Sequence, residues 1–403
     1  MSKPKVRFKK FTNDWEQRKV TDLGEIYIGL VTTMTEHYTN QGHLLIRNSD
    51  IKDGYFEFGE NPIYLDEEFS KQNKSRMHQL GDVITVHTGD IGTSAVIGEN
   101  EANSIGFATI VTRPNQEILD SNYFATYLNT DTHKQWAISM ATGDGRSNYN
   151  LKDYTKLVVP IPEIEEQKKI ATSIVNLNTI ITLHQRKCDD LRKLKKYMLQ
   201  KMFSQNGTNV PEIRFSGFTD AWEQRKFSEL YVKSSEKNDG SIRMDRNITV
   251  ATMQFKEDVK VSTVEYLKTY YTFNLGDIAF EGHQSKEFRY GRFVENDIGN
   301  GIVSHIFAVF RPIKEFDLQF WKYAINNEIL MQRILSRSTK ASTMMHDLVT
   351  EDFLNETFLV PSLDEQKQIG ASLKSLDHLI TLHQHKCDEL KKLKNFMLHN
   401  MFV

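Results

Sequence analysis

IPEIEEQKKIATSIVNLNTIITLHQRKCDDLRKLKKYMLQKMF, residues 161–203, returns as VPSLDEQKQIGASLKSLDHLITLHQHKCDELKKLKNFMLHNMF at residues 360–402. In both copies one set of mostly apolar positions recurs alternately four and three residues apart, which predicts a long helix that packs along a single seam. Pro162 and Pro361 lie just upstream, where a helix tolerates proline. The seam positions are Ile170, Ile174, Leu177, Ile181, His184, Cys188, Leu191, Lys195, Met198 and Met202, and then Ile369, Leu373, Leu376, Ile380, His383, Cys387, Leu390, Lys394, Met397 and Met401.

The two predicted helices are expected to pair with each other in antiparallel fashion. The linker SQNGTNVPEI, residues 204–213, is polar and rich in turn-forming residues, and it spans at most about 35 Å when extended. A chain that leaves the first helix through this linker enters the second domain near the C-terminal end of that helix. At about 1.5 Å per residue the seam is roughly 48 Å long. The alternative is that each helix packs separately on its own domain.

A second repeated string marks the start of each domain. FTNDWEQRK at 11–19 corresponds to FTDAWEQRK at 218–226, whereas the stretches between the repeated ends diverge and share landmarks such as Leu-Gly-Asp at 80–82 and 275–277. Short β-branched runs between Gly and Asp turns, as in 81–98 and 276–294, predict strands. Because a repeat this long is a domain rather than a solenoid unit, two domains are expected.

The predicted fold class is α+β, with two tandem repeats. Each repeat is a mixed, strand-rich globular domain followed by a long helix, and the two helices form an antiparallel coiled coil with pseudo-two-fold symmetry. The predicted parts are a first globular domain at 1–160, a first spacer helix at 161–205, a second globular domain at 206–359 and a second spacer helix at 360–403.

The composition is that of an ordinary globular protein. The 403 residues carry a formal net charge of −2 with 26% charged residues, so disorder is not indicated and any basic footprint for nucleic acid must be local. Cys188 and Cys387 are the only cysteines, too few for a disulfide framework, which fits a reducing compartment. The start lacks the apolar core of a signal peptide and no apolar run approaches membrane-spanning length. We therefore expect a soluble cytoplasmic protein.

Polar segments precede each repeated helix. ATGDGRSNYNLKD at 141–153 and SRSTKASTMMHDLVTED at 336–352 mix Arg, Lys, Ser, Thr and Asn with small residues, the groups that contact phosphates and base edges. Solvated loops have the same composition, so that alternative stays open. The candidate DNA-contact residues are Lys71, Lys74, Arg76, Arg146, Ser147, Asn148 and Tyr149 in the first domain, and His283, Lys286, Arg289, Arg337, Lys340 and Ser342 in the second.

In this duplicated order, the strings resemble the specificity subunit of type I restriction-modification enzymes over nearly the whole chain. The resemblance rests on the Trp-containing opening segments, on GDGRSNYNLKDYTKLVVPIPEIEEQKKIA at 143–171 with its weaker second copy, and on the helices that carry EEQKKI and DEQKQI. The second domain departs from the pattern, with SRSTKASTMMHDL in place of a GDGR loop.

The resemblance implies a function for each part. Each globular domain would be a target-recognition domain that reads one half of a bipartite, asymmetric site in double-stranded DNA. The helices would set the spacing between the half-sites. The repeated segments and helices would bind two methylating subunits, which recruit the motor-nuclease subunits. No cofactor is expected in this chain; S-adenosylmethionine, ATP and Mg are expected on the partner subunits.

The repeated Trp segments are expected to serve the shared partner, because they are repeated where the domains diverge. The candidate partner-binding residues are Trp15, Arg18, Trp222 and Arg225. The alternative is that the two tryptophans form a junction core, since a tryptophan anchors either kind of contact.

No enzymatic motif is complete. Asn-Pro-Ile-Tyr at 61–64 lacks the second proline of an adenine-methyltransferase motif, and no Gly-rich methyl-donor loop accompanies it. Glu-Gln-Lys at 166–168 and 365–367 ends like a nuclease motif but falls at predicted helix starts, where acidic residues stabilise the positive helix end. We expect a non-catalytic DNA-recognition scaffold. A symmetric protein-interaction scaffold and a methyltransferase are the alternatives.

The middle of the seam holds soft metal-ligand types. Antiparallel pairing about residue 186 would bring His184 toward Cys387 and Cys188 toward His383, whereas parallel pairing would place Cys beside Cys. We interpret these side chains as small and polar seam residues that set the register, with no metal. A zinc site is the alternative.

Overall fold

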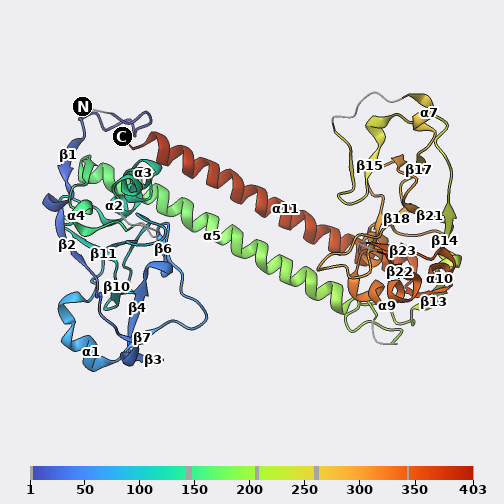
Figure 1. Ribbon diagram of the computed structural model, residues 1–403, viewed down its shortest axis with the longest axis horizontal. Helices are drawn as coiled ribbons and strands as arrows, with labels where there is room; N and C mark the ends of the chain where they lie inside the picture. Colours follow the sequence, from blue (N-terminus) through green and yellow to red (C-terminus); the bar gives the residue numbers. More distant parts are fainter. Residues whose placement is uncertain (1–2, 142–147, 205–207, 258–262, 343–344, 403) are drawn as a thin grey trace. The chain divides into compact units, whose positions relative to one another are not determined.

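The structure is a computed structural model that describes residues 3–141, 148–204, 208–257, 263–342 and 345–402. Its contacts divide the chain into two compact units, Met1–Gln185 with Gln384–Val403, and Arg186–His383. Two helices of 38 residues each, α5 (Ile164–Lys201) and α11 (Leu363–Asn400), are drawn in green and red in Figure 1. They confirm the two long helices of the prediction. Within the described residues, neither these nor any other helix is long and apolar enough to cross a membrane.

The first domain is built on a four-stranded antiparallel sheet in the order β2-β11-β8-β9. Alternate residues of its strands face opposite sides, as the period of two in a strand requires. Val83 and Ile110 pack in the cluster that contains the residues of α2, whereas their neighbours Ile84 and Val111 pack in a separate cluster. The strands are β2 (Gly24–Ile28), β11 (Ile110–Pro114), β8 (Val83–Thr85) and β9 (Ser94–Val96), and α2 is Ser121–Leu128.

Smaller elements complete the first domain. A second four-stranded sheet has the order β10-β4-β7-β3, with β10 and β4 parallel, and two further strand pairs are β5-β6 and β1-β12. Their bounds are β10 (Ile105–Phe107), β4 (His43–Arg47), β7 (Tyr64–Leu65), β3 (Tyr38–Thr39), β5 (Ile51–Lys52), β6 (Tyr55–Phe56), β1 (Glu16–Lys19) and β12 (Val158–Ile161). The remaining helices are α1 (Glu67–Gln72), α3 (Asp131–Met140) and α4 (Leu151–Tyr154).

The second domain repeats the central sheet with other residues, in the order β14-β21-β18-β19. Ile278 and Phe310 pack with the α8 residues, and their neighbours Ala279 and Val309 enter a different cluster. The strands are β14 (Tyr231–Ser234), β21 (Ala308–Pro312), β18 (Ile278–Glu281), β19 (Arg292–Glu295), β13 (Glu223–Lys226), β24 (Thr357–Val360), β15 (Ile248–Thr249), β16 (Gln254–Phe255), β17 (Tyr271–Phe273), β20 (Gly301–Val303), β22 (Thr339–Ala341) and β23 (His346–Leu348). The helices are α6 (Phe227–Leu230), α7 (Val264–Leu267), α8 (Leu318–Ile325), α9 (Glu328–Ser338) and α10 (Thr350–Asn355).

The shared landmarks of the two repeats form one ion pair in each domain. Asp82 accepts hydrogen bonds from the Gln79 backbone N–H at 2.8 Å and from Arg113 Nε at 2.9 Å. Asp277 accepts from the Arg311 Nε at 3.1 Å in the second domain. The glycine of the turn has a φ of +88° in both copies, which an L side chain rarely adopts. Leu-Gly-Asp and Arg-Pro are therefore repeated for a structural reason.

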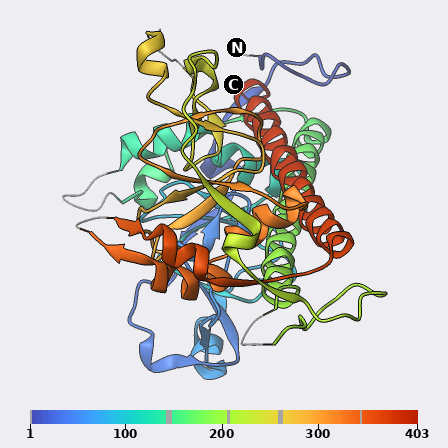
Figure 2. The ribbon, with the colours of Figure 1, turned by 90° about the vertical axis from the view of Figure 1, so that its right-hand side faces the viewer.

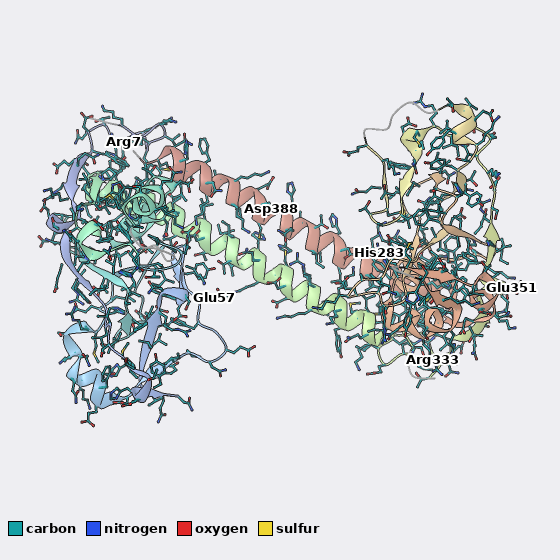
Figure 3. All side chains as sticks on the ribbon, in the orientation of Figure 1. Arg7, Glu57, His283, Arg333, Glu351 and Asp388 are labelled. Carbon is teal, nitrogen blue, oxygen red and sulfur yellow. The ribbon has the colours of Figure 1, made fainter. Side chains whose placement is uncertain are left out.

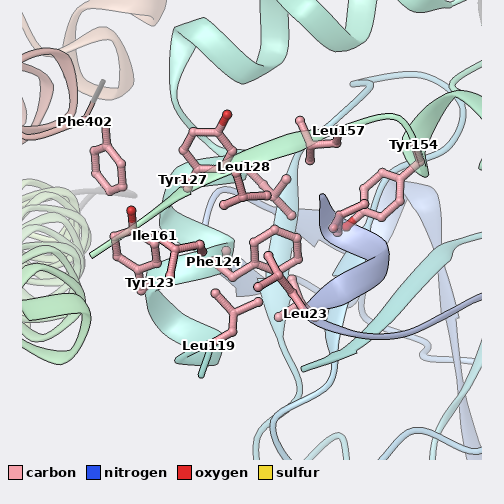
Figure 4. Packing of buried hydrophobic residues seen from close by; sticks show 14 of the residues in the cluster. Leu23, Leu119, Tyr123, Phe124, Tyr127, Leu128, Tyr154, Leu157, Ile161 and Phe402 are labelled. Atoms are coloured by element: carbon pink, nitrogen blue, oxygen red, sulfur yellow. The ribbon is translucent and has the colours of Figure 1, made fainter. Parts of the chain in front are cut away.

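The ends of the long helices belong to the domain cores. Phe402, at the end of α11, stacks on Tyr123 of the first domain with ring centroids 5.5 Å apart (Figure 4). In the second unit Phe203, at the end of α5, stacks on Phe320 at the same distance of 5.5 Å. Both ends carry the string Met-Leu-x-x-Met-Phe, at 198–203 and 397–402. Each domain core thus includes residues from the other repeat.

Within each unit, the C-terminal half of one long helix contacts the N-terminal half of the other, as antiparallel pairing requires. Cys188 Sγ donates to the Ile380 carbonyl at 3.6 Å in the second unit, and Cys387 Sγ donates to the Ile181 carbonyl at 3.6 Å in the first. No group of three or more His, Cys, Asp or Glu side chains that could hold a metal occurs in the described part of the chain. Of the predicted seam residues, Ile170, Ile174, Ile181, Leu191, Ile369, Leu373 and Leu376 are buried, and Leu177, Ile380 and Leu390 are half-buried.

The core of the second domain contains a buried carboxyl group. Glu295 stands opposite Ile278 in the sheet, in the place where the first domain has Val96 opposite Val83. It is 3% exposed, and among the described residues neither of its carboxyl oxygens has a hydrogen-bond partner. Burial raises the pKa of Glu295 well above its usual value, and Asp297 raises it further. The group is therefore protonated at pH values where an exposed glutamate is charged.

We expect Glu295→Gln to weaken the pH dependence of the stability of the second domain. An unfolded glutamate has a pKa of about 4.3, whereas the folded protein keeps this proton to higher pH. Between the unfolded and the folded pKa of Glu295, the free energy of unfolding therefore falls by up to about 1.4 kcal/mol per pH unit as the pH rises. Lys322 lowers this pKa and Asp317 raises it, but neither outweighs burial. Thermal unfolding at about pH 5 and pH 8 measures the effect. Identical pH profiles for the variant and the parent would contradict it.

Candidate nucleic-acid interface

Several loops gather at one end of the central sheet of the first domain. β8 ends at Thr85, which lies opposite both Ile110, the first residue of β11, and Ser94, the first residue of β9. The β8–β9 loop (86–93) and the segment that enters β11 (106–109) therefore lie at the same end. In the second domain Phe280 lies opposite Ala308, which places the loop 282–291 and the segment 304–307 together in the same way. We call these segments the loop end of each domain.

The segment that contains Asn148 closes onto the loop end of the first domain. Asn148 forms an isolated β-bridge with Thr88, whose hydroxyl donates to Asn148 Oδ1 at 2.7 Å. The Tyr149 backbone N–H donates to the His87 carbonyl at 2.9 Å, and the Tyr149 side chain is fully buried. Tyr149 is thus part of the core, which argues against a direct contact of its ring with DNA. Arg146 and Ser147 lie outside the described residues.

Asn48, which was not a candidate from the sequence, ties these segments together. Its Oδ1 accepts from the His87 backbone N–H at 2.7 Å, and its Nδ2 donates to the Ala108 carbonyl at 3.1 Å and to the Phe107 carbonyl at 3.3 Å. One amide therefore fixes the β8–β9 loop against the segment before β11. Nothing local in the sequence distinguishes this asparagine from those of ordinary turns.

In the second domain the β22–β23 hairpin reaches the loop end. The two strands are antiparallel and are drawn in orange-red in Figure 2. The His346 backbone N–H of β23 donates to the Gly282 carbonyl at 2.8 Å, and His283, labelled in Figure 3, forms an isolated bridge with Met345. His283, Lys340 and Ser342 are therefore brought to one end of the sheet, and all three are exposed.

The predicted DNA-contact cations fall into two groups. In the first group the charged group already has a partner within the protein. Lys71 pairs with Glu67 at 2.8 Å, and Arg337 Nε donates to Glu356 at 2.7 Å. Arg76 donates to the Ile28 carbonyl at 2.9 Å, and the Arg289 guanidinium lies 5.5 Å from the ring centroid of Tyr290. In the second group, Lys74, Lys286 and Lys340 are exposed and make no ion pair within the described part of the chain. The second group leaves its ammonium charges available for phosphates.

The predicted partner-binding residues lie in the repeated opening segments. Trp15 is 3% exposed and Trp222 is 4% exposed, and both pack against the phenylalanine at the end of a long helix. This burial favours the junction-core alternative for the two tryptophans. Arg18 is half-buried, and Arg225 is exposed and pairs with Glu229 at 3.2 Å.

The repeated Glu-Gln dipeptides lock the start of each long helix onto its domain. Both carboxyl oxygens of Glu166 accept from Arg7 at 2.7 Å, and those of Glu365 accept from Arg214 at 2.6 and 2.7 Å. Both carboxylates are fully buried, and their hydrogen bonds raise the pKa of Arg7 and of Arg214. Trp222 Nε1 also donates to Glu365 at 3.1 Å. The interpretation of these glutamates as charges at a helix end was incomplete, because their arginine partners are distant in sequence.

The glutamine of each dipeptide bonds to the backbone of its own domain. Gln167 Oε1 accepts from the Asp120 N–H at 2.9 Å, and Gln167 Nε2 donates to the Pro162 carbonyl at 2.9 Å. Gln366 makes the equivalent bonds to Asp317 and Pro361. The repeat of Glu-Gln in the sequence was a usable signal for this lock.

The methyltransferase-like string at 61–64 runs into the sheet. The Leu45 backbone N–H donates to the Ile63 carbonyl at 2.9 Å, and Tyr64 lies opposite Leu44 between β7 and β4. These residues thus have a structural position in the second sheet of the first domain.

Both repeats match a known family. The sequence model of the type I restriction modification DNA specificity domain matches residues 12–193 and again residues 219–392. The chain belongs to this family. The two copies account for the duplicated domain and helix. The match begins in each repeat within the Trp-containing opening segment.

Similar proteins share the name of the family. The specificity subunit of the type I restriction enzyme MjaVIII of Methanocaldococcus jannaschii is 21% identical over 343 residues, which are 81% of this chain and 79% of that protein. The EcoBI specificity subunit of Escherichia coli is 26% identical over 133 residues, 33% of this chain and 28% of that one.

Solved structures show the same fold. The S subunit of a type I restriction-modification system from M. genitalium matches with a TM-score of 0.62 at 14% identity, over 100% of this chain and 99% of that chain. A chain from a study of complex assembly and conformational transition of the type I R-M system matches with a TM-score of 0.51 at 16% identity, over 97% and 98% of the two chains.

Proposed function

We propose that this chain is the DNA-recognition subunit of a type I restriction-modification complex, and that each globular domain reads one half of a bipartite, asymmetric site in double-stranded DNA. One observation carries the proposal. The two domains share a central sheet, an Asp–Arg ion pair and a helix lock, but their loop ends carry different residues. A common scaffold with divergent exposed loops is the arrangement expected for two readers of different sequences.

Phosphate and base contacts would come from the loop ends and the segments next to them. Lys286 and Lys340 would supply salt-dependent affinity for the backbone, and Asn148 and His283 would face base edges. Arg146 and Ser147 keep their proposed role, since they directly precede Asn148 in the sequence. Lys74 is the corresponding candidate for a phosphate contact in the first domain. We propose no contact for the ring of Tyr149.

The outer faces of the long helices would bind the methylating subunits. Besides its seam, each helix exposes four large apolar side chains at equivalent repeat positions, and their spacing of three, eleven and three residues puts them on one face. Two equivalent stripes favour two copies of one partner. The stripes are Ile180, Leu183, Leu194 and Tyr197 on α5, and Leu379, Leu382, Leu393 and Phe396 on α11.

The paired helices would also set the distance between half-sites. In this proposal the seam residues form a continuous antiparallel coiled coil, the domains extend over 1–160 and 206–359, and the helices form the spacer. Methyl transfer, with S-adenosylmethionine, would take place on the methylating subunits, and ATP and Mg would serve the motor-nuclease subunits. This chain itself would be non-catalytic.

The test is to express the chain with its methylating subunits and to map modified adenines across a genome. We expect one asymmetric motif of two specified halves separated by an unspecified spacer. The matched control expresses the methylating subunits without this chain and should show no motif. Modification by this chain alone would favour the methyltransferase alternative. A complex that assembles but neither binds random duplex nor modifies DNA would favour a protein-interaction scaffold and overturn the proposal.

A further inference from the structure

Each loop end exposes large apolar side chains beside its polar groups. In the first domain Phe107 is 39% exposed; it is the last residue of β10 and lies within the segment that enters β11. In the second domain Ile306 is 74% exposed within the corresponding segment that enters β21. Although the surrounding sequences differ, an apolar side chain reaches solvent at the same end of both sheets.

The backbone holds Phe107 firmly in its exposed position. Ala108 has a φ of +49°, which is uncommon for a residue with a side chain, and its N–H donates to the Leu30 carbonyl at 2.9 Å. Asn48 Nδ2 donates to the carbonyls of both Phe107 and Ala108, and Asn48 Oδ1 accepts from the His87 N–H. The backbone from which the Phe107 side chain projects is therefore fixed relative to the loop that also contacts Asn148.

The segment that carries Ile306 is also anchored. The Phe307 backbone N–H donates to the Ser304 carbonyl at 3.1 Å, and Phe307 packs against the buried cluster that contains Val309. His283 and Met345, bridged to each other, lie at the same end of the sheet. Ile306 thus projects from a turn that its neighbour pins to the core.

Exposure alone does not assign a role, because single exposed apolar residues are common on protein surfaces. Leu80 and Leu275 make this clear: they are 66% and 50% exposed at the opposite end of the two sheets, in the Leu-Gly-Asp turns. The loop ends differ because groups that suit contacts with nucleic acid lie beside the apolar side chains. These groups are Asn148 in the first domain and Lys340 in the second. Apolar side chains contact the thymine methyl group or enter a base step.

We propose that Phe107 and Ile306 contact nucleobases, each in the half-site read by its own domain, and so help to determine the recognised sequence. The inference rests on the proposed function. It assigns specificity to a segment that neither precedes a long helix nor carries charge. The two residues act independently, because each belongs to a different domain.

The test uses the full chain in complex with its methylating subunits. In the map of modified adenines, Phe107→Ala should make the first half of the motif degenerate and leave the second half unchanged, and Ile306→Ala should do the reverse. On a duplex that carries the mapped site, each variant should bind about 10-fold or more weakly, the loss expected for one good base contact. The unchanged half reports that the other domain and the complex are intact, and an unchanged thermal unfolding profile reports that the substituted domain is folded.

The matched controls are Leu80→Ala and Leu275→Ala, which remove similar side chains at the opposite ends of the sheets and should leave both halves intact. A duplex with uracil in place of thymine separates the two kinds of contact. If the uracil duplex binds more weakly and Phe107→Ala weakens its binding no further, Phe107 contacts a thymine methyl group. If Phe107→Ala weakens binding to the uracil duplex further, Phe107 enters a base step. Unchanged motifs in both alanine variants, or equal effects of the controls, would overturn the inference. A parent complex that shows no motif at all would overturn the proposed function itself.

Discussion

A half-length chain, residues 1–206, is expected to dimerise and to direct modification to an inverted repeat of the first half-site. It contains one globular domain and all of α5. Two copies related by a two-fold axis would each supply the helix end that α11 supplies in the intact protein. The site should change from asymmetric to symmetric, with a spacer close to that of the parent.

The contacts in the first unit support this expectation, because the residues in the last turns of α11 and just after it that make them have identical counterparts at the end of α5. In the first core Phe402 stacks on Tyr123, and Lys394 pairs with Asp53 at 2.8 Å. Phe203 and Lys195 of a second copy would take these places. The identical pairs are Cys188 and Cys387, Lys195 and Lys394, Met198 and Met397, Leu199 and Leu398, Met202 and Met401, and Phe203 and Phe402.

The fragment offers its own matched control. Met202 and Phe203 belong to the second core in the intact chain, but in the fragment they would complete the first core of the partner copy. Replacing both by alanine should therefore abolish the dimer, since each buried side chain contributes about 2–5 kcal/mol. Light scattering measures the mass, and adenine mapping measures the site. A fragment that stays monomeric at high concentration, or a dimer that marks the parent's asymmetric site, would contradict the prediction.

Arg214→Met is expected to loosen the second domain from the start of α11. It leaves the carboxylate of Glu365 fully buried, with Trp222 Nε1 as its remaining hydrogen-bond donor among the described residues, and leaving a buried charge unpaired costs about 3–5 kcal/mol. Adding Glu365→Gln removes the charge and should restore much of the loss. Hydrogen exchange of the second domain, with the first domain as an internal reference, measures the effect.

Arg225→Met is the matched control for the lock. Arg225 lies in the same opening segment but pairs on the surface with Glu223 and Glu229, so its loss should change exchange little. If Arg214→Met altered protection no more than Arg225→Met, the buried pair would not hold the helix to the domain. Trp222→Phe and Trp15→Phe extend the comparison, because only the first removes a described hydrogen bond to the glutamate.

The long helices and the duplicated architecture could be predicted from the sequence because they depend on periodic spacing and repeated strings. The Leu-Gly-Asp turns could also be predicted, because the turn requires a positive φ and so has a glycine in both copies. Helix ends were harder to place. The stretch 319–335 contains two helices, α8 and α9, which are separated where the Asn327 side chain accepts from the Ile329 N–H and starts a new helix.

The candidate site could be predicted only in outline. Composition pointed to the segments before the long helices, but it could not show that Tyr149 turns inward or that Glu356 neutralises Arg337, because these depend on tertiary neighbours. Asn48 donates hydrogen bonds to residues that lie 59 and 60 positions away in the sequence, so no local sequence pattern marks its role. The roles of the proposed DNA and partner contacts stay predictions.

The packing of Phe402 in the first core has a consequence for biosynthesis. A ribosome makes about 5–20 residues per second, so the second repeat takes roughly 10 to 40 s, and throughout that time the nascent first domain lacks the aromatic ring that stacks on Tyr123. We expect the end of α5 on a neighbouring nascent chain of the same polysome, which carries the same Met-Leu-x-x-Met-Phe string, to be able to pack in this position. The core of the first domain would then be completed only after α11 has emerged, and pairing between unfinished chains would compete with that step.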